Sequence, residues 1–136
     1  MPRLMFSVIL WLGAVACGPD CSKDDLDGTY LVMTTERSGT CGDMGDFVSQ
    51  MNHGESTQEP GCTPSYSRWS DDECTNEASG VCTGTADNIR TEATGSLTQK
   101  DDDGERFEGV IEFTIKDATT GETLCISTYD LEYERQ

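Results

Sequence analysis

The chain has 136 residues and carries 26 acidic against 9 basic side chains, a formal net charge of −17. This length suits one modest domain and excludes a large multidomain enzyme or a protein with several membrane spans. The strong negative charge argues against a nucleic-acid binder that relies on phosphate contacts.

The first sixteen residues show the three parts of a secretory signal peptide. Arg3 supplies a positive charge, an apolar stretch follows, and small residues precede Cys17. The 12 residues of the stretch 4–15 are too few to span a bilayer, which takes about 20. The sequence therefore predicts a signal peptide over residues 1–16.

Two cleavage mechanisms suit the segment Ala14-Val15-Ala16-Cys17-Gly18. The segment resembles the lipobox of bacterial lipoproteins, in which the cysteine receives diacylglycerol and becomes the new N-terminus, although Ala14 stands where that family prefers Leu. Ala14 and Ala16 also suit the ordinary signal peptidase, which would release a soluble protein. Lipidation of Cys17 leaves six cysteines, an even number that suits an oxidising compartment, and we therefore favour a lipoprotein.

The lipobox resemblance implies a protein of the cell envelope whose first partner is the membrane itself. Residues 17–26 are then a lipidated N-terminus and polar tether, and residues 27–136 are the exported domain. Gly18 follows the cysteine in place of Asp. By resemblance to Gram-negative sorting patterns, this favours the outer membrane, on its periplasmic or its surface side.

The first part of the domain predicts short strands separated by polar segments. One strand is expected over residues 29–36, and residues 47–51 suit either a short strand or a helical turn. The stretch 52–80 is rich in Gly, Ser, Pro, Asn and acidic residues, which predicts a loop-rich middle with one short strand near residues 66–69. A further strand is expected over residues 81–85.

The last third of the chain shows the clearest pattern. Apolar and polar residues alternate over residues 106–116, a period typical of a half-buried strand; the predicted inward residues are Phe107, Ile111, Phe113 and Ile115. Residues 89–99 and 122–135 repeat the pattern. Asp103-Gly104 and the segment ending at Gly121 suit hairpin turns. Residues 88–135 therefore predict a three-stranded antiparallel meander.

These elements together predict an all-β domain, a small antiparallel meander that forms a barrel or sandwich. Only 16 of the 120 residues after position 16 are Leu, Ile, Val or Phe, so disulfides are expected to contribute much of the stability. Six cysteines allow fifteen pairings. Cys74 and Cys82 could close a local loop, Cys125 needs a distant partner such as Cys21, and Cys41 and Cys62 flank the loop-rich middle.

The start of the first strand, Asp27-Gly28-Thr29-Tyr30, resembles the Gly-x-Trp start of lipocalin-like barrels, with Tyr30 in place of Trp. Together with the lipobox, the scattered cysteines and the segment 127–131, it also makes the chain similar to small cysteine-rich bacterial lipoproteins of unassigned function. This resemblance implies a localisation and a β architecture, and it carries no catalytic residue.

No catalytic or metal-binding motif stands out. The single histidine, His53, lies in a polar turn, which is typical of a solvated side chain. The sequence has no nucleophile elbow or phosphate-binding loop, and its cysteine spacings lack the close pairs typical of zinc sites. The acidic turns 24–28 and 101–104 do not match EF-hand spacing, although their charge leaves weak calcium binding open. We expect no enzymatic activity, resident metal or cofactor.

The leading hypothesis is a non-enzymatic, lipid-anchored envelope lipoprotein with a structural or interaction role. One alternative is a lipocalin-like barrel for a small apolar ligand, although the low apolar content speaks against a sizeable cavity. Another is a secreted inhibitor-like module that presents residues 62–82 as a stapled loop. Tyr66 and Trp69 could form an exposed platform or cover the open end of a barrel. A cavity of several hundred Å³ with apolar walls would favour the barrel.

Overall fold

The structure, a computed structural model, describes residues 19–52, 54–56, 62–84 and 87–136. Cys17 and His53 lie outside these ranges. A short 3-10 turn, η1 (Lys23–Asp25), precedes eight strands. The strands are β1 (Gly28–Gly39), β2 (Phe47–Asn52), β3 (Glu55–Ser56), β4 (Cys62–Trp69), β5 (Thr75–Thr83), β6 (Ile89–Gln99), β7 (Arg106–Asp117) and β8 (Thr123–Arg135).

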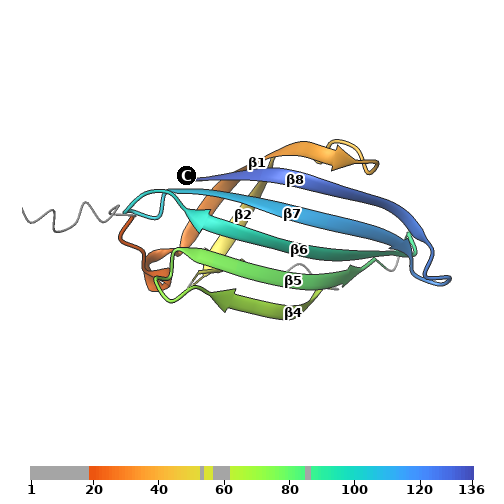
Figure 1. Cartoon of the computed structure of the whole chain (residues 1–136), viewed down its shortest axis with the longest axis horizontal. Coiled ribbons are helices and arrows are strands. Elements are labelled where there is room, and N and C mark those ends of the chain that lie inside the picture. The colour runs from red at the N-terminus through yellow and green to blue at the C-terminus, as the bar shows by residue number, and fades with distance from the viewer. Residues whose placement is uncertain (1–18, 53, 57–61, 85–86) are drawn as a thin grey trace, which may run out of the picture.

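All eight strands belong to one antiparallel sheet in the order β3-β2-β1-β8-β7-β6-β5-β4. The strands follow one another as a meander, and β1 then pairs with β8, so that β3 and β4 remain as the two edges. The sheet curls into a half-barrel, with β1 and β2 passing behind β5–β7 (Figure 1). The predicted all-β class and the predicted meander over residues 88–135, now β6–β8, are confirmed.

The loop-rich middle predicted over residues 52–80 is wrong in most of its secondary structure, although the short strand expected near residues 66–69 is present as the second half of β4. β4 and most of β5 lie within it, and residues 47–51 belong to a strand rather than a helical turn. Richness in Gly, Ser, Pro, Asn and acidic residues does not exclude strands here: Pro64 lies in β4, which is an edge strand with a register irregularity between Pro64 and Tyr66. Proline is tolerated at edges and at bulges.

The core lies on the concave face of the half-barrel, where the alternating residues of β7 and β8 meet β1. One buried cluster contains Tyr30 and Phe107, and a second contains Val32, Tyr129 and Leu131. Leu97 and Trp69 pack against the first cluster and Ile111 and Phe113 against the second. The inward face predicted for β7 is therefore confirmed at Phe107, Ile111 and Phe113.

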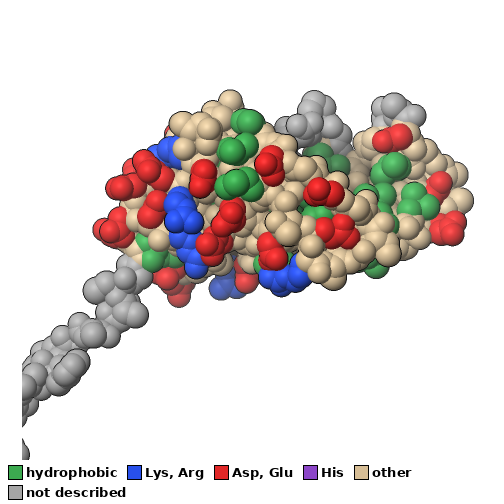
Figure 2. Space-filling view, turned by 90° about the horizontal axis from the view of Figure 1, so that it is seen from above, with side chains coloured by type: hydrophobic (Ala, Val, Ile, Leu, Met, Phe, Trp, Pro, Cys, Tyr) green, Lys and Arg blue, Asp and Glu red, His purple; other side chains and the backbone are tan. Residues whose placement is uncertain are grey.

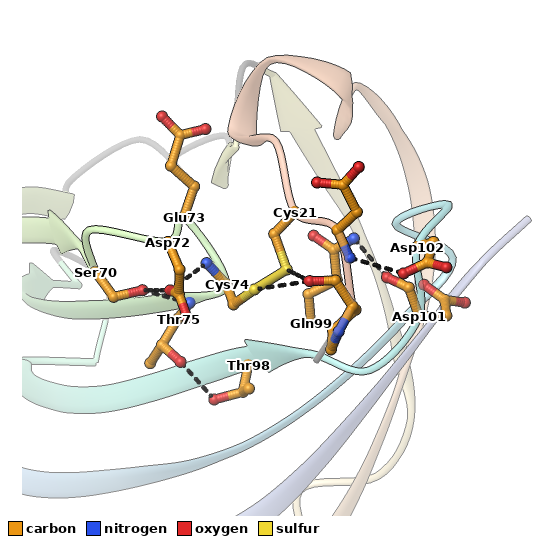
Figure 3. Close-up of a disulfide and its surroundings, with 12 residues drawn as sticks. Cys21, Ser70, Asp72, Glu73, Cys74, Thr75, Thr98, Gln99, Asp101 and Asp102 are labelled. Carbon is orange, nitrogen blue, oxygen red and sulfur yellow. Dashed lines mark hydrogen bonds between the residues drawn. A yellow bond between two sulfur atoms is a disulfide. The ribbon is translucent and has the colours of Figure 1, made fainter. Parts of the chain in front are cut away.

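The N-terminal segment is part of the domain rather than a free tether. Cys21 is bonded to Cys74, the backbone N–H of Asp20 donates to the carboxylate of Asp102 at 2.7 Å, and Leu26 is 1% exposed. Figure 3 shows this bridge between the segment and the turn before β5. The tether predicted over residues 17–26 is thus too long, because the residues from Cys21 onward are held by covalent and apolar contacts.

All six cysteines from Cys21 onward form disulfides, as the even number predicts. The bonds are Cys21–Cys74, Cys41–Cys125 and Cys62–Cys82. The pairings suggested from the sequence, Cys74 with Cys82 and Cys125 with Cys21, are wrong. Cys62 and Cys82 are direct partners in the register of β4 and β5, and Cys41 reaches Cys125 because β1 pairs with β8. Both relations depend on the sheet topology.

Candidate ligand-binding cavity

The concave face holds a cavity of about 340 Å³ over β5 and β6. Small residues of these two strands form its floor, and larger apolar side chains from β6 itself and from four other strands, β2, β4, β7 and β8, surround them. The floor residues are Ala78, Gly80, Ala93 and Gly95; the surrounding side chains include Met51, Trp69, Leu97, Ile111, Leu131 and Tyr133. Both the volume and the apolar walls are typical of small-molecule sites.

The cavity exists because the floor lacks large side chains. Ala78 pairs with Gly95 and Gly80 with Ala93 in the register of β5 and β6, so four small residues are contiguous on one face. The expectation that a low apolar content prevents a sizeable cavity is wrong, since too few large side chains are present to fill the concave face. The recurrence of Ala-x-Gly in both strands is the sequence signal that could have located this floor.

Glycine is required at two positions beside the cavity. A Cβ atom at Gly95 would lie 2.7 Å from the backbone oxygen of Val110, so β6 and β7 approach too closely for a side chain. A Cβ atom at Gly54, where φ is +75°, would lie 2.8 Å from the Trp69 ring. The ring of Trp69 therefore packs on the turn between β2 and β3, and the two edges of the half-barrel meet there.

The two predicted platform residues lie on different faces of β4. Trp69 pairs with Asn76 and packs in the core cluster, whereas Tyr66 pairs with Ser79 and is 45% exposed. Of the alternative in which both residues cover the open end of the barrel as part of the core, the core placement is confirmed for Trp69 and wrong for Tyr66. Together the two side chains do not form a platform.

The described lining of the cavity is uncharged. Its polar groups include the hydroxyl of Tyr133 and the amide of Asn76. Burial raises the pKa of Tyr133, with a smaller opposing effect from its hydrogen bond to Ser49. The Asn76 amide nitrogen donates to Ser67 Oγ at 3.1 Å and to the Arg68 carbonyl at 3.3 Å, which orients the amide.

Charged side chains lie on the opposite face and at the ends of the sheet. Arg37 pairs with Asp130, and Lys116 pairs with Glu92 at 3.1 Å. These pairs are a third to a half exposed, so each contributes little to stability. Figure 2 shows acidic side chains spread over the face in view and gathered at one end of the molecule, on the left of the picture.

The acidic turns use their carboxylates to hold the backbone. Asp101 Oδ1 accepts hydrogen bonds from the N–H groups of Glu105 and Arg106, at 3.0 and 3.4 Å. Over the ranges that the structure describes, no three His, Cys, Asp or Glu side chains converge as a metal site.

None of the helices in the described part of the chain has the length and apolar character to cross a membrane. Comparison with known proteins adds no relative: no family model, no curated protein and no solved structure matches the chain.

Proposed function

We propose that this protein is exported, lipid-anchored and non-enzymatic, and that its β-domain binds a small molecule in the concave cavity. The cavity of about 340 Å³ is the observation that supports the binding role. A filled interior would favour a purely structural role instead. The inhibitor-like alternative has less support, because the hairpin closed by Cys62–Cys82 lies within the sheet and does not protrude from it.

Binding can be tested by filling the cavity. We expect Ala93→Leu to lower affinity for the neutral dye N-phenyl-1-naphthylamine at least about tenfold, because the new side chain occupies the floor. Cavity filling commonly leaves stability unchanged or raises it by about 0.5–2 kcal/mol, so lost affinity would not reflect unfolding. Fluorescence titration measures the affinity and urea denaturation the stability. Ala118→Leu, an exposed position in the β7–β8 turn, is the matched control.

The disulfides support the lipid-anchored part of the proposal. Because the six cysteines from Cys21 onward pair with one another, Cys17 has no intramolecular partner among them. A spare thiol is unusual in an oxidising compartment, and attachment of diacylglycerol through a thioether removes it. Each methylene buried in the bilayer contributes about 0.8 kcal/mol, so the three chains that a lipoprotein of this pattern carries would make a lasting anchor. The outer membrane remains the proposed location, because Gly18, and not Asp, follows Cys17.

Such an anchor would hold the domain close to the bilayer. Cys17 is four residues from Cys21, which is bonded to Cys74, and four extended residues span at most about 14 Å. The end of the half-barrel that carries the β4–β5 and β6–β7 turns would therefore face the membrane.

Cys17→Ser is expected to move the exported protein from the detergent phase to the aqueous phase of a Triton X-114 extraction. The serine cannot accept diacylglycerol through a thioether, so the anchor is lost. The double variant Cys21→Ser/Cys74→Ser is the matched control, because it also removes cysteines but keeps Cys17, and it should stay in the detergent phase. Unchanged detergent-phase recovery of the Cys17→Ser protein would contradict lipidation.

A further inference from the structure

We infer that the cavity selects uncharged ligands, so that its natural ligand is a small, neutral, apolar molecule rather than a fatty acid or another organic anion. This inference rests on the proposed binding function and names the ligand class. It follows from the charge of the lining, the positions of the basic side chains and the shape of the floor.

Among the residues that the structure describes, the lining has no charged side chain, although the chain is rich in them. Charged residues make up 26% of the sequence, yet none of the nineteen described lining residues is Asp, Glu, Lys or Arg. If charged residues were as frequent in the lining as in an average protein, about five of the nineteen would be charged. An anionic ligand would therefore enter without a counter-charge, and burying an unpaired carboxylate is costly.

Three basic side chains of the sheet have their partners outside the described lining of the cavity. The guanidinium of Arg135 donates to Tyr30 Oη and to the Asp25 carbonyl, at 2.8 and 2.9 Å. Arg90 and Lys116 both pair with Glu92. The full chain has a net charge of −17, which further repels anions.

The floor and walls suit an apolar ligand with a flat part. The Ala and Gly residues of β5 and β6 leave a smooth surface, and the Trp69 and Tyr133 rings lie among the surrounding side chains. The hydroxyl of Tyr133, which is hydrogen-bonded to Ser49, is neutral at physiological pH, and burial raises its pKa further. Tyr133 therefore places no charge beside a ligand.

Two dyes with the same aromatic skeleton test the inference. N-Phenyl-1-naphthylamine is neutral, and 8-anilinonaphthalene-1-sulfonate differs from it by an added sulfonate. We expect the full-length Cys17→Ser protein, which lacks acyl chains that would take up dye, to bind the neutral dye at least about tenfold more tightly. The preference should persist in 0.5 M NaCl, in which the Debye length falls to about 4 Å, because desolvation of the sulfonate inside the cavity is not screened.

Equal affinity for the two dyes, or a preference that disappears in high salt, would overturn the inference. If neither dye binds, the proposed binding function itself fails. Ala93→Lys places a cation on the floor and should raise affinity for the sulfonate dye at least about fivefold, whereas Ala118→Lys adds the same charge outside the cavity and should not. Asn76→Lys, at another lining position, repeats the test should Ala93→Lys fail to fold; no gain from a folded variant counts against the inference.

Discussion

Replacing Cys41 and Cys125 together by serine is expected to lower the free energy of unfolding by more than replacing Cys62 and Cys82. The two bonds close segments with sequence separations of 84 and 20, for which chain entropy corresponds to about 4.5 and about 3.3 kcal/mol. Urea denaturation of the two double variants, each with the same number of Cys→Ser changes, measures the difference.

The surroundings of the two disulfides also indicate that loss of Cys41–Cys125 destabilises the fold more than loss of Cys62–Cys82. Cys62 and Cys82 join strands that the β4–β5 ladder already holds together. Cys41 lies after β1, where its backbone N–H donates to Ser127 Oγ at 2.7 Å and Tyr129 Oη donates to the Gly42 carbonyl at 2.6 Å. Loss of the bond to Cys125 weakens the hold on these contacts as well. Equal urea midpoints for the two variants would contradict this account.

The strands that the sequence pattern locates are those with large apolar residues at alternate positions. β7 is recognisable because Phe107, Ile111 and Phe113 repeat with a period of two, and its neighbours in the meander follow the same rule more faintly. The first half of β4 and most of β5 escape the prediction, and in β5 the inward positions carry small residues such as Ala78 and Gly80. The feature that hides β5 in the sequence is the one that leaves the cavity open.

Tertiary neighbours explain what the sequence leaves undecided. The number of disulfides follows from the even cysteine count, but their pairing requires β1 to lie beside β8 and β4 beside β5. Trp69 could be singled out as a large aromatic residue in a polar stretch, yet its packing on Gly54 depends on the curl of the sheet. The predicted tether over residues 17–26 is too long because a polar composition does not reveal that Leu26 is buried or that Cys21 is bonded to Cys74.

The effect of Tyr30→Ala should rival that of losing a disulfide. The ring of Tyr30 is fully buried and packs edge-on against Phe107, with centroids 5.7 Å apart. Its hydroxyl donates to the Gly104 carbonyl at 2.8 Å, and the Arg135 guanidinium donates to it and lies over its ring. Removing a buried aromatic side chain costs about 3–5 kcal/mol. Tyr66→Ala, at an exposed position, is the matched control and should change stability by less than about 0.5 kcal/mol.

Tyr30→Phe separates the hydroxyl from the ring. It keeps the packing but removes the hydroxyl from the Gly104 carbonyl and from Arg135, which retains its bond to the Asp25 carbonyl, for a loss of about 1–3 kcal/mol in the free energy of unfolding. The hydroxyl also makes stability depend on pH. Burial, partly opposed by Arg135, raises the pKa of Tyr30, and the unfolded chain therefore loses this proton first. The stability that the neutral Tyr30 hydroxyl contributes is fully present below the pKa of the unfolded chain, about 10, and is lost as the pH rises through the pKa of the folded protein.

We therefore expect the wild-type urea midpoint to fall between pH 8 and about pH 10.5. Tyr133, whose pKa burial also raises, contributes to the same fall. The double variant Tyr30→Phe/Tyr133→Phe should start from a lower midpoint at pH 8 and then change less than the wild type. An equal alkaline fall in both proteins would show that groups other than these two buried tyrosines control stability at high pH.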